Sequence, residues 1–205
     1  MAWVMFDYGG VISRWPSEQD MAMLAAAGGI SVRRLADAYW QRRPAYDRAE
    51  VDGAAYWQQV GLIAGRSQAY SESEVAELIR LDTDSWLHLE AGTVALIEEL
   101  AAVGHRLALL SNAPAETAEA IAGLPVARHF EHLIFSCELK IAKPDTEFFT
   151  VALARLGATA PEVIFIDDRP ENVAAAVTLG MQSILFASPG QARALLSQLL
   201  ARHRW

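Results

Sequence analysis

Residues 2–10 of the 205-residue chain read AWVMFDYGG, an apolar run that ends at an aspartate and two glycines. A short continuous apolar run that stops at Asp7 and a Gly-Gly pair predicts a buried strand followed by a turn. Such runs without polar alternation are typical of strands that are covered on both faces. Four similar runs follow, at residues 107–110, 133–135, 163–166 and 183–186.

Helix-like segments separate these runs, and this alternation predicts a parallel α/β sheet. They cover residues 93–103, 115–122, 146–156, 172–179 and 191–201. The long interval after the first strand has no clear strand of its own, but it carries helix signals such as the capping-box pattern from Ser71 to Glu74. We therefore predict an α/β core of residues 1–15 and 91–205 with an inserted α-helical domain at residues 16–90.

The predicted insertion is rich in aromatic residues. Some of them must pack its own small core, which is the commoner role of an aromatic side chain, and others could line a pocket against the sheet. Arg42 and Arg43 are further candidates for substrate contacts, although surface positions are the commoner role for such residues. The aromatic residues in or bordering the insertion are Trp15, Tyr39, Trp40, Tyr46, Tyr56, Trp57, Tyr70 and Trp86.

Composition narrows the class of protein. A net charge of -8 with no cluster of Lys and Arg argues against a nucleic-acid partner. Cys137 is the only cysteine, so an intrachain disulfide or a thiolate zinc cluster is excluded and a reducing cytoplasmic location is expected. The apolar run at residues 2–6 is too short for a membrane span or a signal segment. We expect a cytoplasmic protein without a membrane partner, and no pattern indicates its oligomeric state.

Polar residues follow four of the predicted strands, where an open parallel sheet places its ligand crevice. Adjoining carboxylates repel one another unless a cation joins them, and oxygen ligands favour Mg²⁺. A lysine and a hydroxyl suit a phosphoryl group, which a carboxylate can attack. Each residue alone would be read as a turn or capping residue, but together they predict a phosphate and metal site. The segments are Asp7-Tyr8-Gly9-Gly10, Ser111-Asn112, Lys143-Pro144-Asp145 and Asp167-Asp168.

In this order the segments resemble the four motifs of the haloacid dehalogenase-like (HAD) hydrolase superfamily. The resemblance covers nearly the whole chain outside the insertion and implies a Rossmann-like core with a helical cap. It also implies a Mg²⁺-dependent hydrolase of a small phosphomonoester, with a sugar phosphate as one candidate. The matching segments are residues 3–11, 107–112, 143–145 with Phe148, and 163–173.

The resemblance also implies roles for individual residues. Asp7 would be the nucleophile that forms an aspartyl-phosphate, and Lys143 would neutralise charge on Asp7 and on the phosphate. Residues that would bind the phosphoryl oxygens are Tyr8, Gly9, Ser111, Asn112 and Lys143. Residues that would hold Mg²⁺ are Asp7, Asp168 and, through its backbone carbonyl, Gly9, with Asp167 and Asn172 in support.

Gly9 departs from the pattern of the family's phosphatases, which carry at this position a second Asp that donates a proton to the leaving group. A positioned general acid contributes about 10²–10⁴-fold to rate, so its loss predicts slow turnover. One alternative is therefore a phosphate-binding or interaction protein with negligible turnover. Another is a haloacid-type dehalogenase, which also lacks the second Asp but needs no metal. The retained Asp167-Asp168 pair argues against the dehalogenase.

Overall fold

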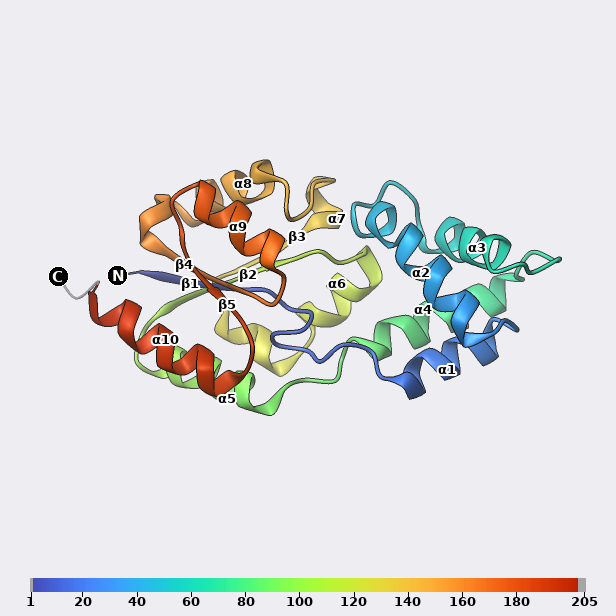
Figure 1. Ribbon diagram of the computed structural model, residues 1–205, viewed down its shortest axis with the longest axis horizontal. Coiled ribbons are helices and arrows are strands. Elements are labelled where there is room, and N and C mark those ends of the chain that lie inside the picture. Colours follow the sequence, from blue (N-terminus) through green and yellow to red (C-terminus); the bar gives the residue numbers. More distant parts are fainter. Residues whose placement is uncertain (1, 203–205) are drawn as a thin grey trace.

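The computed structural model describes residues 2–202 and contains a five-stranded parallel sheet with helices on both faces (Figure 1). The strand order is β3-β2-β1-β4-β5, so the first strand lies at the centre. The predicted parallel α/β sheet is confirmed, and the strand ends shift by at most one residue. The strands are β1 (Trp3–Phe6), β2 (Arg106–Ser111), β3 (His132–Phe135), β4 (Val163–Asp167) and β5 (Gln182–Leu185).

In β1 to β4, alternate side chains enter two separate hydrophobic clusters, which explains why these strands are continuously apolar. Val4 and Phe6 of β1 belong to a cluster shared with α5, α6 and α10, whereas Trp3 and Met5 belong to one shared with α8 and α9. The flanking helices are α5 (Ala91–Ala102), α6 (Ala115–Ala122), α8 (Thr146–Leu156), α9 (Pro170–Thr178) and α10 (Pro189–Arg202). Shorter elements in the connections are η1 (Pro125–His129), α7 (Ser136–Leu139) and η2 (Ala160–Glu162).

Residues 18–85, the helical segment, form four helices between β1 and α5 and lie beyond the carboxyl edge of the sheet (Figure 1). A third hydrophobic cluster holds them together, with Tyr39, Trp57 and Leu78 fully buried in it. The capping box predicted from Ser71 to Glu74 is present. The interval in which a helical insertion was predicted thus contains four helices, and its bounds as a domain, residues 16–90, stay a prediction. Its helices are α1 (Glu18–Ala27), α2 (Val32–Asp47), α3 (Gly53–Ile63) and α4 (Glu72–Ser85).

The chain crosses between the sheet and the helical segment twice, and the two crossings are bonded to each other. The Arg14 amide donates to the His88 carbonyl at 2.9 Å. The Ser13 hydroxyl donates to the Trp86 carbonyl at 2.6 Å, and the Tyr8 hydroxyl donates to the same carbonyl at 2.8 Å. The end of the helical segment is therefore bonded to the loop that follows β1.

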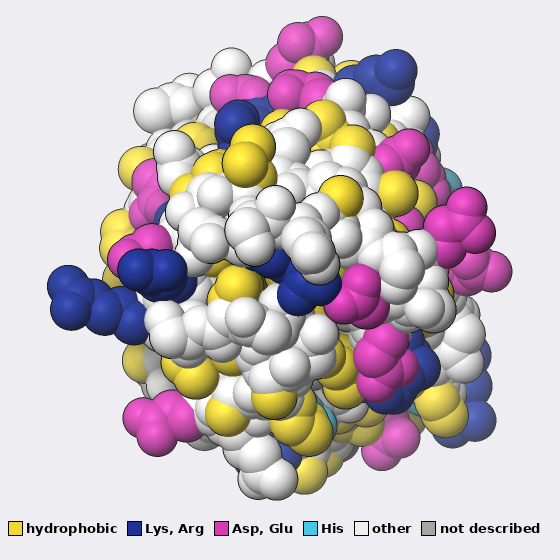
Figure 2. Space-filling model, turned by 90° about the vertical axis from the view of Figure 1, so that its right-hand side faces the viewer, with side chains coloured by type: hydrophobic (Ala, Val, Ile, Leu, Met, Phe, Trp, Pro, Cys, Tyr) yellow, Lys and Arg dark blue, Asp and Glu magenta, His cyan; other side chains and the backbone are white. Residues whose placement is uncertain are grey.

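Charges of both signs are interspersed on the outer face of the helical segment (Figure 2). On α4, for example, Arg80 pairs with Glu77 at 2.7 Å and with Asp84 at 2.6 Å. This face therefore presents no extended field of one sign. Among residues 2–202, no helix combines the length and the hydropathy that crossing a lipid bilayer requires.

The third cluster predicts a sharp contrast between two leucines of the helical segment. Leu78 is fully buried, whereas Leu62 is 74% exposed. Leu78→Ala should lower the free energy of unfolding by about 2–5 kcal/mol, because it removes buried contacts and leaves a cavity. Leu62→Ala, the matched control, should change it by less than about 0.5 kcal/mol. Urea unfolding followed by circular dichroism measures both, and equal losses would contradict the assignment of Leu78 to a packed core.

Candidate functional site

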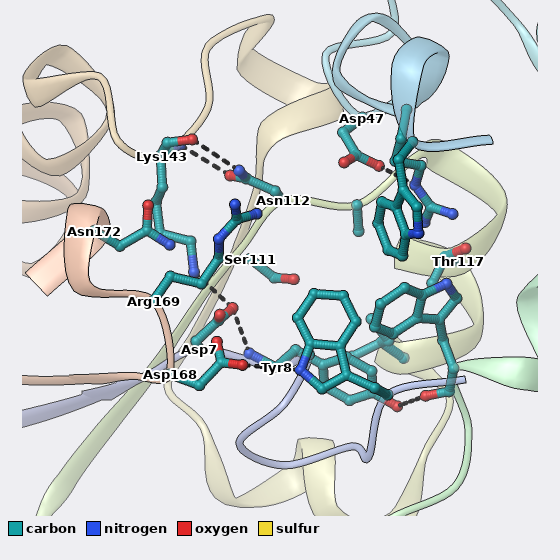
Figure 3. A pocket seen from close by; sticks show the side chains of 17 residues that line it. Asp7, Tyr8, Asp47, Ser111, Asn112, Thr117, Lys143, Asp168, Arg169 and Asn172 are labelled. Carbon is teal, nitrogen blue, oxygen red and sulfur yellow. Dashed lines mark hydrogen bonds and ion pairs between the residues drawn. The ribbon is translucent and has the colours of Figure 1, made fainter. Parts of the chain in front are cut away.

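Asp7 lies at the carboxyl end of the central strand, where the parallel register also brings the end of β4. The Asp7 amide donates to the Ile166 carbonyl at 2.8 Å, which continues the β1-β4 ladder by one residue. The Lys143 ammonium lies 2.6 Å from Asp7 Oδ1 (Figure 3) and 2.8 Å from Asp167 Oδ2. All three side chains are nearly or fully buried. The structure thus joins predicted residues from three segments far apart in the sequence.

Asp167 has hydrogen-bond donors on both carboxylate oxygens. The Asn172 amide lies 3.0 Å from each oxygen, and the Arg169 backbone amide donates to Oδ1 at 2.8 Å. Lys143 occupies Oδ2 as well. Both oxygens of Asp167 are thus engaged by the protein, and the supporting role of Asp167 and Asn172 stays a prediction.

Asp168 accepts fewer hydrogen bonds than Asp167. Its Oδ2 accepts a hydrogen bond from the Trp15 indole nitrogen at 2.9 Å. Its Oδ1 is buried and has no hydrogen-bond partner within residues 2–202. One carboxylate oxygen each of Asp7, Asp167 and Asp168 lies within 4.8 Å of the other two. Such a set of hard oxygen donors fits a divalent cation.

Burial and mutual repulsion set the protonation of this cluster. Burial, and next the Asp167 charge, raise the pKa of Asp7 well above its ordinary value, while Lys143 opposes the rise. Burial also raises the pKa of Asp168. For Lys143 burial lowers the pKa, but the charges of Asp167 and Asp7 outweigh it and raise the pKa overall. Three carboxylates and one ammonium leave a formal charge of -2, which a divalent cation would balance.

Residues after β2 arrange Lys143 and the cavity wall. Asn112 Oδ1 accepts from the Lys143 amide and Asn112 Nδ2 donates to the Lys143 carbonyl, both at 2.9 Å (Figure 3). The Asn112 side chain therefore positions Lys143 here, and its predicted contact with phosphate stays a prediction. Ser111 is 2% exposed and lines the cavity beside Asp7. Tyr8 contributes its backbone, because its amide donates to Asp7 Oδ1 at 2.6 Å while its ring is buried.

Gly9 lies against the indole of Trp86, the residue that directly follows α4. A Cβ atom at this position would be 2.9 Å from Cζ3 of Trp86, closer than packed side chains approach. Trp86 is held in place, because its indole nitrogen donates to the Tyr39 hydroxyl at 3.1 Å and its ring contacts Trp15. The space that a side chain at position 9 would need is therefore filled by Trp86.

Two adjoining cavities open above Asp7. The inner one, of about 80 Å³, is lined by the predicted residues Asp7, Tyr8, Gly9, Ser111, Asn112, Lys143, Asp168 and Asn172. The outer one, of about 570 Å³, lies between α2 and the loops around Pro144 and Glu171. Five further residues line both cavities, and the positions of the predicted strand ends did not identify any of them as catalytic. They are Trp15, Trp40, Arg43, Asp47 and Arg169. The sequence signal that could have identified Asp47 is its position four residues after Arg43, in a helix rich in aromatic residues.

Comparison with known families places most of the chain in one group. Residues 2–180 match the model of the haloacid dehalogenase-like hydrolases. A sesquiterpene phosphatase of Aspergillus oryzae is 28% identical over 179 residues, which are 86% of this chain and 85% of that protein.

Two further proteins are similar in part or in fold. A phosphorylated carbohydrates phosphatase of Thermotoga maritima is 30% identical over 80 residues, 38% of this chain and 37% of its own length. The structure of a HAD family enzyme of Bacteroides thetaiotaomicron, in complex with magnesium and inorganic phosphate, superposes with a TM-score of 0.73 at 19% identity. That alignment covers 90% of this chain and 93% of the other, and at this identity it shows the fold alone.

The contact between Gly9 and Trp86 predicts an energetic coupling. Gly9→Ala should lower the free energy of unfolding by about 1–3 kcal/mol, because the added methyl group must push back a fixed indole. The cost should largely disappear in a Trp86→Ala background, which a double-mutant cycle by urea unfolding measures. Gly123→Ala is the control, since a Cβ there meets only ordinary contacts from 3.5 Å. Equal costs of Gly9→Ala in both backgrounds would argue against the contact.

Removal of the buried ammonium predicts a pH-dependent loss of stability. Lys143→Met should lower the free energy of unfolding near neutral pH by about 3–5 kcal/mol, because Asp7 and Asp167 then lack their shared cation. A carboxyl group whose pKa is raised in the folded state takes up protons on folding, so it becomes more destabilising as pH rises above its ordinary value. The deficit should therefore be larger at pH 8 than at pH 5 in metal-free buffer.

Urea unfolding at the two pH values, with EDTA present, tests this expectation. Lys140→Met, the same exchange at an exposed position, is the control. A deficit that is constant with pH, or larger at pH 5, would show that Lys143 does not hold the carboxylates in their ionised form.

Proposed function

Because the chain belongs to the haloacid dehalogenase-like hydrolase family, we propose that it hydrolyses a small phosphomonoester with Mg²⁺ through an aspartyl-phosphate on Asp7. The observation that carries this proposal is the buried contact of Asp7 Oδ1 with the Lys143 ammonium at 2.6 Å, on the floor of a cavity. A carboxylate fixed in this way can attack a phosphoryl group whose negative charge the same ammonium offsets.

The attack step depends on keeping Asp7 ionised while a second anion approaches. Burial raises the pKa of Asp7 and thereby favours the unreactive acid, whereas the Lys143 charge favours the carboxylate. Lys143 is itself held between Asp7 and Asp167, and its backbone is fixed by Asn112. An orienting role for Lys143 follows from these contacts in addition to its charge. Ser111, on the same cavity wall, would donate its hydroxyl to a phosphoryl oxygen.

The donor set fits Mg²⁺, because Asp168 Oδ1 is buried without a partner in residues 2–202 and the three carboxylates meet within 4.8 Å. Asp7 and Asp168 would hold the ion together with the backbone carbonyl of Gly9. Asp167 and Asn172 would support the site through their contacts with each other and with Lys143. When bound, the ion would supply charge that neutralises the phosphoryl oxygens.

The helical segment would act as a cap, within residues 16–90, that closes the substrate cavity from above. Trp15 and Trp40 line both cavities and are each more than 40% exposed, so they are available to a leaving group. A flat aromatic wall suits the face of a sugar ring as well as an apolar chain. The similar phosphatases act, by their names, on sesquiterpenes and on phosphorylated carbohydrates, so both classes of phosphomonoester are candidates.

A second candidate function is phosphate binding with negligible turnover. Its support is Gly9, where the phosphatases that this sequence resembles carry the proton-donating Asp, and the indole of Trp86 that fills the space. Such a protein would bind inorganic phosphate with Mg²⁺ but would release none from an ester.

The assay that tests the proposed function is phosphate release from a panel of phosphomonoesters, which includes sugar, terpenoid and aryl phosphates. Release should require Mg²⁺ and stop when EDTA is added. Asp7→Asn should lower the rate by at least about 10³-fold, because the amide oxygen is a far weaker nucleophile than a carboxylate. Asp37→Asn, the same exchange at an exposed residue of α2, is the control that should retain Mg²⁺-dependent release.

Three outcomes would contradict the proposal. Phosphate binding without release from any ester would favour the second candidate function. Release that Asp7→Asn leaves intact would exclude Asp7 as the nucleophile. Halide release from a 2-haloacid in the presence of EDTA would favour the dehalogenase.

A further inference from the structure

Among the described residues, the core side of the cavity has no carboxyl group outside the carboxylate cluster. Gly9 has no side chain, and Trp86 fills the adjoining space. Asp7 and Asp168 belong to the carboxylate cluster, which faces Lys143 and would hold the cation. The remaining acidic residue that lines the inner cavity in the described part of the chain is Asp47.

Asp47 lies on the opposite side of the cavity from Asp7, at the end of α2 (Figure 3). In the displacement of an ester at phosphorus, the leaving oxygen departs roughly in line with the attacking oxygen and on the far side. Attack by Asp7 from the floor therefore points the leaving oxygen toward the helical segment. Asp47 is the acidic residue of the helical segment that faces the leaving oxygen.

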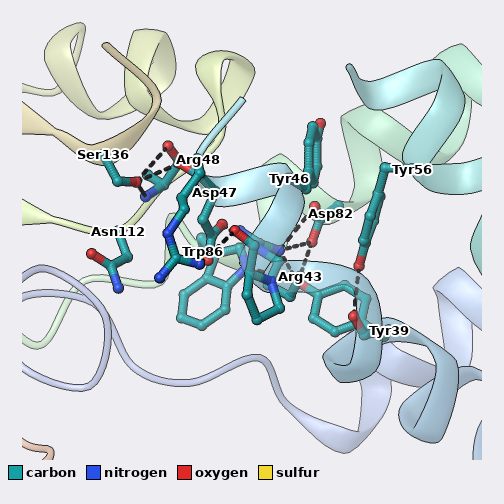
Figure 4. A network of polar contacts seen from close by, with 12 residues as sticks. Tyr39, Arg43, Tyr46, Asp47, Arg48, Tyr56, Asp82, Trp86, Asn112 and Ser136 are labelled. Atoms are coloured by element: carbon teal, nitrogen blue, oxygen red, sulfur yellow. Dashed lines mark hydrogen bonds and ion pairs between the residues drawn. The ribbon is translucent and has the colours of Figure 1, made fainter. Parts of the chain in front are cut away.

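Contacts with the core fix the position of Asp47 (Figure 4). The hydroxyl of Ser136, the first residue of α7, donates to the Asp47 backbone carbonyl. The preceding residue bonds to α6, where the Tyr46 hydroxyl donates to Glu116 at 2.9 Å. The following residue, Arg48, pairs with Asp145 of the core at 3.3 Å. Residues 46–48, at the end of α2, thus contact three separate core segments around the cavity.

The guanidinium of Arg43 lies between the carboxylates of Asp47 and Asp82. Arg43 donates to Asp47 through Nε at 2.6 Å and faces both oxygens of Asp82 through Nη1 at 3.1 and 3.2 Å. Asp82 accepts a further hydrogen bond from the Tyr39 hydroxyl at 2.6 Å. Asp47 has the single contact with Arg43 and is the group that can carry a proton.

The burial of Asp47 supports this assignment. Its side chain is 13% exposed. Burial raises the pKa of Asp47, although the charge of Arg43 opposes the rise and that of Asp82 adds to it. Arg48, the other cation near the carboxyl group, is engaged by Asp145. A carboxyl group poised in this way can give up a proton and take it back.

We propose that Asp47 supplies the general acid and base that Gly9 cannot supply, a role that rests on the function proposed above. As Asp7 bonds to phosphorus and the ester P–O bond breaks, the Asp47 proton passes to the leaving oxygen and an alcohol departs. The Asp47 carboxylate then takes a proton from water as the water oxygen bonds to phosphorus. The bond from phosphorus to Asp7 breaks, inorganic phosphate leaves, and Asp47 is again protonated.

The test compares two leaving groups in the presence of Mg²⁺. p-Nitrophenolate departs from its ester without a proton, whereas an alkoxide needs one. With Asp47→Asn, the first turnover of the alkyl phosphate should slow by about 10²–10⁴-fold. The burst of p-nitrophenolate, followed by stopped flow, should change by less than about 10-fold. Its steady state should slow, because water attack loses its base. Asp47→Ser should give the same pattern and serves as a second variant.

Asp37→Asn is the matched control, because it is the same exchange at an exposed position of the same helix. It should leave the rates on both esters unchanged. Equal losses on both esters for Asp47→Asn, or the same discrimination in Asp37→Asn, would overturn the role of Asp47 while leaving the proposed function in place. An unmutated protein that hydrolyses no ester would overturn both.

Discussion

The ammonium of Lys143, buried between Asp7 and Asp167, is the contact around which the rest of the site is arranged. Two carboxylates at the ends of adjacent strands repel each other strongly once water is excluded, and one shared cation relieves that repulsion. Asn112 holds the Lys143 backbone, and Asn172 holds Asp167 from the other side. Each of these polar groups has a hydrogen-bond partner, because an unpaired polar or charged group inside the protein would be unfavourable. Lys143 is one of the two lysines in the chain.

Much of this site could be predicted from the sequence, because the relevant information is local. Parallel strands end at one edge, so residues that follow buried apolar runs must meet there. Asp7, Ser111 and Asp167 follow directly from that geometry, and Lys143 follows from the resemblance to a known motif. The capping box at Ser71 could be recognised for the same reason, since its two partners are three residues apart.

The other side of the cavity could not be predicted in this way. The contacts of Trp86 with Gly9 and of Trp15 with Asp168 depend on how four helices sit over the sheet. Nothing in the spacing of Asp47 and Arg43 distinguishes a surface ion pair from a buried one that faces a cavity. Aromatic residues of the helical segment could be predicted to serve a core or a pocket, and Trp57 turned out to be fully buried whereas Trp40 lines both cavities. Packing between distant segments decides between these roles.

The bonded pair of crossings between the sheet and the helical segment has a mechanical consequence. A rotation that opens the cavity without breaking the bonds of Arg14 to His88 and of Ser13 to Trp86 must take this pair as its hinge. The hinge then lies immediately beside Gly9, two residues from Asp7. The indole of Trp86 is attached at the same point, so opening the entrance and reshaping the wall next to Asp7 would be one movement. In the proposed reaction, the covalent path of the chain would thereby couple substrate entry to the geometry of attack.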